Sequence, residues 1–105
     1  MAQFVVGNIS ELQQTSLQCI NLEDQQFVLI YHEQAFSLLD NLCPHKAAAL
    51  CEGNIVGDEV HCPWHKARFD IKTGRGLSPL SGQGVKSWPL IEQDGQLLVE
   101  LDVNA

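Results

Sequence analysis

The sequence predicts an all-β protein, an antiparallel sandwich or incomplete barrel that carries an inserted lobe. Short apolar segments rich in β-branched and aromatic residues recur along the chain, and polar turn segments separate them. A helical turn is expected only at Ser10–Leu12. The chain has 105 residues, of which 45% are hydrophobic, and this is enough for one small domain spanning residues 1–105.

Four strands are expected before residue 42, in segments where apolar residues dominate. They are Phe4–Val6, Leu17–Ile20, Phe27–Tyr31 and Ala35–Leu39, with turns at Glu23–Gln25 and His32–Gln34. Two hairpins are expected later in the chain. The first joins Asn54–Val56 to Glu59–His61 through Gly57-Asp58, and the second joins Val85–Leu90 to Leu97–Leu101 through Asp94-Gly95.

Two short motifs offer metal ligands. The first hook is Cys43-Pro44-His45, and the second hook, Cys62-Pro63-Trp64-His65, follows after sixteen residues. Two thiolates and two imidazoles hold zinc tetrahedrally or divide between two irons. Each hook contributes one Cys and one His, whereas zinc fingers commonly place their cysteines in one hook and their histidines in another. The pairing therefore favours an iron–sulfur cluster, with structural zinc as the alternative.

The segments around the hooks resemble the two cluster-binding loops of soluble Rieske ferredoxins. The resemblance rests on Cys43-Pro44-His45-Lys46, Cys62-Pro63-Trp64-His65, Ala67-Arg68-Phe69-Asp70 and Thr73-Gly74. It implies one Rieske-type [2Fe–2S] cluster per chain, with Cys43 and Cys62 on one iron and His45 and His65 on the other. It also implies a cluster-binding lobe at about residues 42–80, with a third loop from Ser78-Pro79-Leu80 near the cluster.

Residues near the second hook predict a low reduction potential. High-potential relatives carry a serine two residues after the second histidine and a tyrosine four residues after it, where this chain has Ala67 and Phe69, which have no hydroxyl to donate. Ala48 and Trp64 occupy the positions where those relatives have a disulfide. Because hydrogen bonds to the sulfurs are a main determinant of the potential, we expect a midpoint at or below about −50 mV.

One position departs from the family pattern. Many members carry glycine directly after the second histidine, and this chain has Lys66. Lys46 and Lys66 are expected to be solvated or to contact a partner.

The other two cysteines are expected to pack rather than to bond. Cys19 lies in an alternating segment typical of a strand, where a buried thiol behaves as a small apolar side chain. Cys51 lies eight residues after Cys43. A disulfide between Cys19 and Cys51 is the less favoured alternative.

Four other polar or aromatic side chains have structural expectations. His61 should point away from the site, because successive side chains of a strand alternate between faces. His32 is expected in a turn, and Trp88 in the core. Arg68 and Asp70 are expected to pair with each other or to brace the loops.

Charge and hydropathy exclude several classes of function. The net charge is −7, and all six basic residues fall between Lys46 and Lys86, so a nucleic-acid partner is not expected. An acidic body with cations near the cluster loops would orient docking to another redox protein. The N-terminus lacks the features of a signal peptide, and no apolar run approaches the ~20 residues of a membrane span. We expect a cytoplasmic protein without a membrane anchor.

The resemblance implies a one-electron carrier rather than an enzyme. It implies transfer from a flavin-dependent reductase to a terminal oxygenase of the aromatic-ring dioxygenase type, through docking of a monomer at a tip formed by His45 and His65. A separate mononuclear iron site is not expected, because His32 and His61 lack suitable companions in the sequence. The alternatives are a small Rieske subunit of an assimilatory nitrite reductase and, more distantly, a structural zinc-binding interaction module.

Overall fold

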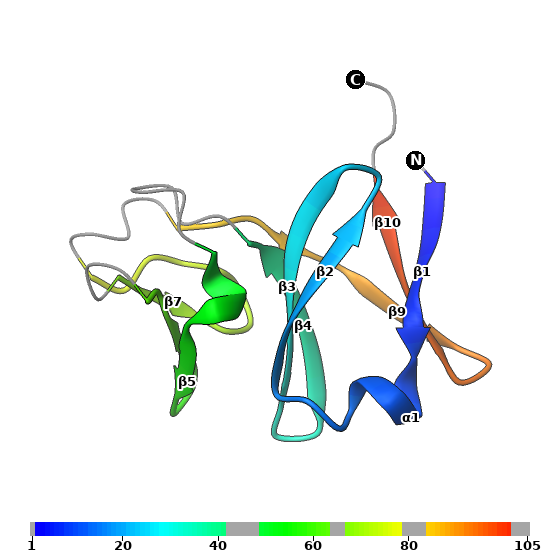
Figure 1. Ribbon diagram of the computed structural model, residues 1–105, viewed down its shortest axis with the longest axis horizontal. Helices are drawn as coiled ribbons and strands as arrows, with labels where there is room; N and C mark the ends of the chain where they lie inside the picture. Colours follow the sequence, from blue (N-terminus) through cyan, green and yellow to red (C-terminus); the bar gives the residue numbers. More distant parts are fainter. Residues whose placement is uncertain (1, 42–48, 64–66, 79–83, 102–105) are drawn as a thin grey trace.

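The computed structural model describes residues 2–41, 49–63, 67–78 and 84–101. Within these ranges the chain forms three antiparallel sheets, with the strand orders β1-β10-β9, β2-β3-β4-β8 and β5-β6-β7. Figure 1 shows the third sheet at one end of the molecule, the first sheet at the other end and the second between them. The expectation of an all-β antiparallel fold is confirmed.

The first sheet contains the first and last strands of the described chain. Its strands are β1 (Ala2–Asn8), β9 (Leu90–Gln93) and β10 (Gln96–Leu101). A short helix, α1 (Ile9–Leu12), follows β1, as the sequence predicts. The start of this helix is bonded to the turn between β9 and β10, because the N–H of Ile9 donates to the carbonyl of Gly95 at 2.9 Å.

The second sheet is the central layer. Its strands are β2 (Leu17–Leu22), β3 (Gln25–His32), β4 (Ala35–Asp40) and β8 (Ser87–Trp88). Four consecutive residues of β3, Phe27–Ile30, have no exposed surface. Because successive side chains of a strand point to opposite faces, this run shows that both faces of the sheet are covered. The first two sheets together are called the base below.

Each face of the central sheet belongs to a different core. Phe27, Leu29 and Leu38 pack against the first sheet in a cluster called the base core, which also contains Leu12, Leu97, Val99 and Leu101. Val28, Ile30 and Leu39 face the other way, into the lobe-side core, whose remaining members are Leu50, Val60, Cys62, Ala67, Phe69 and Ile71. The second cluster attaches the third sheet to the base.

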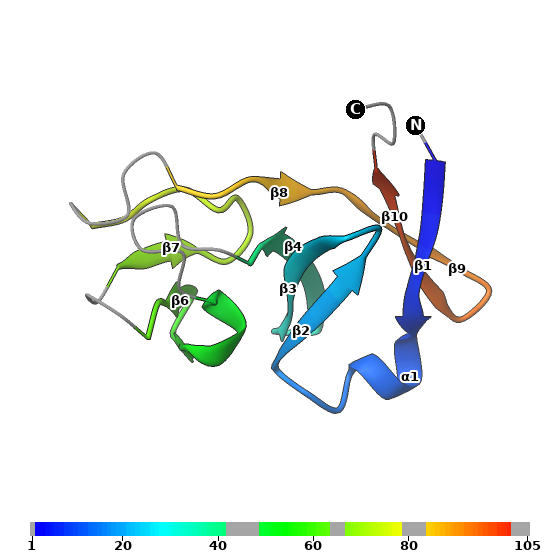
Figure 2. The ribbon, with the colours of Figure 1, turned by 45° about the horizontal axis from the view of Figure 1, so that its top comes forward.

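The third sheet is part of an inserted lobe. The lobe comprises a short 3₁₀ helix, η1 (Leu50–Glu52), and three strands, β5 (Asn54–Val56), β6 (Glu59–His61) and β7 (Arg68–Asp70). The chain enters the lobe after β4 and returns in β8, and these two strands are neighbours in the central sheet. Where they meet, the N–H of Asp40 donates to the carbonyl of Lys86 at 2.9 Å. Figure 2 shows β8 running back from the lobe toward the base beside β4.

Two details of the strands differ from the sequence predictions. His32 is the last residue of β3 and not a turn residue, because the turn is a two-residue loop of Glu33 and Gln34. Both turn residues have positive φ, as a tight hairpin turn of type I′ requires. The predicted strand Val85–Leu90 is instead two short strands, β8 and β9, separated by Pro89, which has no N–H for a ladder bond.

Trp88 is half-buried rather than fully in the core. Its ring meets Phe27 edge to face, with centroids 5.5 Å apart, and its Nε1 donates to Asp40 Oδ1 at 2.8 Å. The ammonium of Lys86 lies 3.9 Å from its ring centroid. No helix within the described ranges has the length and apolar character that a membrane span requires.

Candidate functional site

Asn41 joins the two ends of the chain that flank the first hook. Its carbonyl accepts the N–H of Leu50 at 2.6 Å, and its side-chain Oδ1 accepts the N–H of Cys51 at 2.8 Å. Its own N–H donates to the carbonyl of Gln26 on β3 at 3.1 Å. Asn41 is 2% exposed and is the one buried polar side chain of the described residues. Cys43, His45 and Lys46 lie outside the described residues, but the two ends from which they extend are held together.

The first residue of the second hook, Cys62, is a buried cysteine. Cys62 directly follows β6, is 4% exposed and belongs to the lobe-side core. Its N–H donates to the carbonyl of Ala67 at 2.8 Å, so the ends on either side of residues 64–66 also meet. Trp64, His65 and Lys66 lie outside the described residues.

Arg68 holds the segment that precedes the third, proline-containing loop. Its backbone N–H donates to Ser78 Oγ at 3.2 Å, and its carbonyl accepts the N–H of Leu77 at 2.9 Å. Its guanidinium donates to the carbonyl of Leu77 at 2.9 Å and to Glu59 Oε1 at 3.3 Å. Arg68 therefore braces the lobe as expected, whereas its charged partner is Glu59 and not Asp70. Pro79 and Leu80 lie outside the described residues.

Asp70 and Gly74 shape the turn after β7. Oδ1 of Asp70 accepts the N–H groups of Lys72 and Thr73, at 2.8 and 3.1 Å. Gly74 has φ +77°, and a Cβ on it would collide with the backbone of Val85. The N–H of Val85 donates to the carbonyl of Gly74 at 2.8 Å. The Thr73-Gly74 pair therefore lets the chain on the far side of residues 79–83 approach the lobe closely.

Residues in and next to the hooks belong to one apolar cluster. Leu50 follows the first hook, Cys62 begins the second and Ala67 follows it. All three are members of the lobe-side core together with Phe69. Cys62, at the start of the second hook, offers a soft sulfur donor with almost no contact with water. Such a donor suits an iron–sulfur cluster, because solvent exposure is one determinant of a cluster's potential. The described part of the site therefore fits the group that the hooks imply.

The histidines outside the hooks have carboxylate partners. His61 Nε2 lies 3.0 Å from Glu59 Oε1, two residues away on the same face of β6, as strand alternation predicts. His32 Nε2 lies 3.0 Å from Asp58 Oδ1 in the turn of the lobe hairpin, and Glu33 completes a group whose possible ligand atoms lie within 4.8 Å of one another. The group has one histidine and two exposed carboxylates, so it is not a 2-His-1-carboxylate set.

The expectation of two packing cysteines is also wrong, because Cys19 and Cys51 form a disulfide with their Cα atoms 5.1 Å apart. Cys19 is exposed on the face of β2 that looks toward the lobe, and so it is not the buried thiol that the strand pattern suggested. Cys51 lies on η1, which packs against β2 and β3. No local pattern in the sequence indicates this contact, because it depends on the packing of the lobe against the base.

Replacing Asn41 by alanine should lower the free energy of unfolding by about 1–3 kcal/mol, because the part-buried N–H of Cys51 would lose its acceptor. Asn21→Ala is the matched control, since Asn21 is exposed on β2. Urea unfolding followed by circular dichroism measures both. Equal stabilities of the two variants would show that Asn41 is not a structural anchor.

Comparison with known proteins gives one family model and a set of similar sequences. A family model described as "Rieske [2Fe-2S] domain" matches residues 2–89. The chain is 33% identical over 82 residues to the ferredoxin component of the naphthalene 1,2-dioxygenase system of Pseudomonas aeruginosa, a match that covers 78% of this chain and 79% of the relative.

Solved structures share the fold. The Sphingomonas yanoikuyae B1 ferredoxin superposes with a TM-score of 0.88 at 22% identity, and the match covers 96% of this chain and all of that one. A chain from the complex of reduced oxygenase and oxidized ferredoxin in carbazole 1,9a-dioxygenase gives a TM-score of 0.84 at 22% identity and covers 95% of this chain and 97% of that one.

Proposed function

The chain belongs to the Rieske [2Fe–2S] domain family, and we propose that it carries single electrons from a flavin-dependent reductase to a terminal oxygenase of the aromatic-ring dioxygenase type. The observation that carries the proposal is its similarity, over most of both chains, to the ferredoxin component of a naphthalene dioxygenase system. The site adds support, because the chain segments on either side of each hook are hydrogen-bonded to each other and pack on the lobe-side core. Asn41 bonds to Leu50 at the first hook, and Cys62 bonds to Ala67 at the second.

We assign the ligands to Cys43, His45, Cys62 and His65, for one cluster per chain of residues 1–105, with the cluster-binding lobe at about residues 42–80. When bound, such a cluster takes up and releases one electron at a time. The described residues support it by holding the hook ends: Asn41 at the first hook, Cys62 and Ala67 at the second.

The proposed docking surface is the tip that carries His45 and His65, and the protein acts there as a monomer in the cytoplasm. Its charge supports transient docking, because the body is acidic while the basic residues are confined to 46–86. Of these, Lys72 and Arg75 are exposed in the turn after β7, and Arg68 is engaged by Glu59 and Leu77.

Reconstitution tests the function. The purified protein is mixed anaerobically with NADH and a flavin-dependent reductase, and bleaching of the visible absorbance is followed. A terminal aromatic-ring dioxygenase, its substrate and oxygen are then added, and product is measured with and without the protein. We expect product formation to require the protein. Turnover that is unchanged when it is omitted would contradict the proposal.

We also propose a low potential, with a midpoint at or below about −50 mV, since Ala67 and Phe69 have no hydroxyl group. Ala67→Ser should raise the midpoint by about 60 mV or more. This figure corresponds to one added hydrogen bond to a charged group, worth about 1.5 kcal/mol, since about 59 mV is tenfold in a one-electron equilibrium.

A redox titration monitored by visible absorbance measures the midpoints. Ala35→Ser, on an exposed position of β4, is the matched control and should leave the midpoint unchanged. A wild-type midpoint well above zero would contradict the proposal of a low potential.

A further inference from the structure

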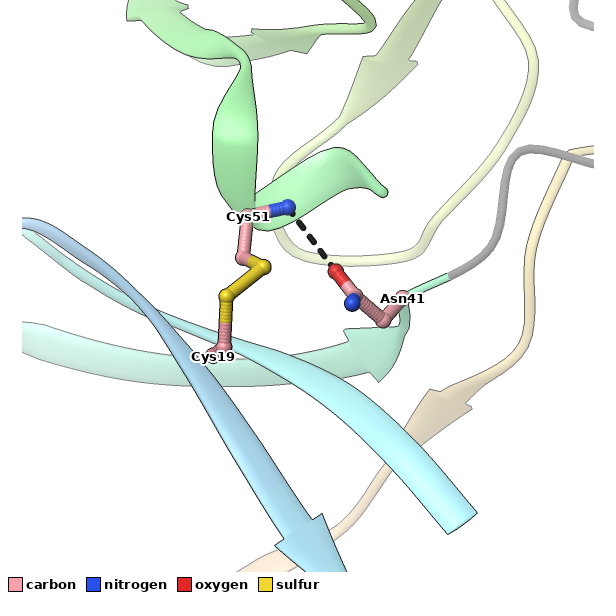
Figure 3. The surroundings of a disulfide bond; sticks show 3 residues. All are labelled: Cys19, Asn41 and Cys51. Atoms are coloured by element: carbon pink, nitrogen blue, oxygen red, sulfur yellow. Dashed lines mark hydrogen bonds between the residues drawn. A yellow bond between two sulfur atoms is a disulfide. The ribbon is translucent and has the colours of Figure 1, made fainter. Parts of the chain in front are cut away.

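The disulfide between Cys19 and Cys51 connects the lobe to the edge of the base. Cys19 lies on β2, an edge strand of the central sheet, and Cys51 lies on η1, six residues after the end of the first hook. The two residues are 32 positions apart in the sequence. Figure 3 shows the bond crossing from the strand to the short helix.

A continuous set of contacts leads from this bond to both ends of the first hook. The N–H of Cys51 donates to Asn41 Oδ1 at 2.8 Å, as Figure 3 shows. Asn41 precedes Cys43 by two residues, and its carbonyl accepts the N–H of Leu50, the neighbour of Cys51. The position of Cys51 therefore helps to fix where the first hook starts and ends.

We propose that Cys19 and Cys51 are a second redox site, a two-electron dithiol–disulfide couple whose disulfide form fastens the ends of the first hook to the base and whose dithiol form loosens them. The consequence for cluster retention rests on the proposed function, whereas the couple itself does not. The couple consists of these two cysteines alone. The other two cysteines of the chain, Cys43 and Cys62, are assigned to the cluster.

Exchange with a dithiol reductant gives a balanced reaction. A thiolate of the reductant attacks the sulfur of Cys19, the more exposed residue of the pair, the Cys19–Cys51 bond breaks, and Cys51 leaves as a thiolate and takes up a proton. The second thiol of the reductant then displaces Cys19, which also takes up a proton. The reductant leaves as a disulfide, so that two electrons and two protons have passed to the protein. A glutathione disulfide reverses the reaction and leaves as two molecules of glutathione.

The proposed location in the cytoplasm suggests that the couple responds to the redox state of the cell. Cytoplasmic thiols are kept reduced, and the disulfides that do form there are usually transient and sense the redox state. The dithiol form would then be the resting form, and oxidising conditions would close the bond. Closing it limits the freedom of the unfolded chain and ties the lobe to β2, so that Asn41 separates less often from Leu50 and Cys51.

The first test maps the thiols of the cluster-loaded protein. Samples equilibrated anaerobically with oxidised glutathione or with dithiothreitol are quenched in acid, denatured, alkylated and digested for mass spectrometry. We expect a linked pair of peptides containing Cys19 and Cys51 in the oxidised sample and alkylation of both residues in the reduced sample. Complete alkylation of both cysteines after oxidation would overturn the proposal.

The second test compares the two forms of the wild-type protein, so that it does not depend on a variant that fails to fold. Loss of visible absorbance into an excess of an iron chelator should be about tenfold faster from the dithiol form, and the midpoint of thermal unfolding should be lower by about 10 °C or more. Cys19→Ser is the matched control and should lose its colour at the fast rate in both buffers. Equal rates and equal midpoints for the two wild-type forms would overturn the proposal.

The two proposals fail separately. A protein without an iron–sulfur cluster would contradict the electron-carrier function, while thiol mapping and the unfolding midpoint would still decide whether the couple exists. A coloured protein in which Cys19 and Cys51 never bond would leave the carrier function intact and remove the second redox site.

Discussion

Cys62→Ser should yield a protein without a cluster, with the iron content falling from about two atoms per chain to almost none. Cys62 lies at the start of the second hook, 4% exposed in the lobe-side core. The substitution keeps the size of the side chain but replaces a soft sulfur donor by a hard oxygen donor that is neutral at pH 7. Visible absorbance and iron analysis of the purified protein measure the effect.

Other cysteine and histidine variants provide the comparisons for this experiment. Cys19→Ser removes a cysteine of the disulfide and should keep its iron when freshly purified. His65→Ala should lose the colour, whereas His61→Ala should keep it, because His61 bonds to Glu59. Full iron content in Cys62→Ser, or loss of iron in His61→Ala, would contradict the assigned ligands.

Phe69→Ala should lower the free energy of unfolding by about 3–5 kcal/mol, a large part of the stability of a small domain. Phe69 has no exposed surface, and it pairs with Val60 in the middle of the lobe sheet. Removing its ring would leave a cavity in the lobe-side core, to which Cys62 and Leu50 also belong. Chemical denaturation followed by circular dichroism measures the loss, and the cluster should also be released faster.

The control for Phe69 is Val56→Ala on the same sheet. Val56 is 50% exposed, and its truncation should change stability by no more than about 0.5 kcal/mol. A Phe69→Ala variant as stable as Val56→Ala would mean that the lobe does not depend on this core.

Much of the fold follows from local patterns. The continuous apolar run at Phe27–Ile30 predicted a strand, and the structure explains the run by covering both faces of that strand. Asp94-Gly95 predicted a hairpin turn correctly, because this dipeptide tolerates positive φ at both positions. Glu33 and Gln34 carry no such signal, and the end of β3 was therefore misplaced.

The features that the sequence did not predict depend on contacts between distant segments. The Cys19–Cys51 bond forms because η1 packs on β2, and no local spacing encodes that contact. The anchoring role of Asn41 also depends on contacts with residues farther along the chain, Leu50 and Cys51. An asparagine at the end of a predicted buried strand, two residues before a ligand motif, was the signal that was present. The ligand residues Cys43, His45 and His65 remain predictions from the hooks.

Metal analysis combined with electron paramagnetic resonance tests the central claim most directly. The protein is purified anaerobically, its iron, sulfide and zinc are measured, and its spectrum is recorded before and after reduction with dithionite. We expect a red-brown protein with about two irons and two sulfides per chain, silent when oxidised and giving the signal of a one-electron-reduced cluster after reduction. A colourless protein with one zinc per chain and no signal would contradict the account.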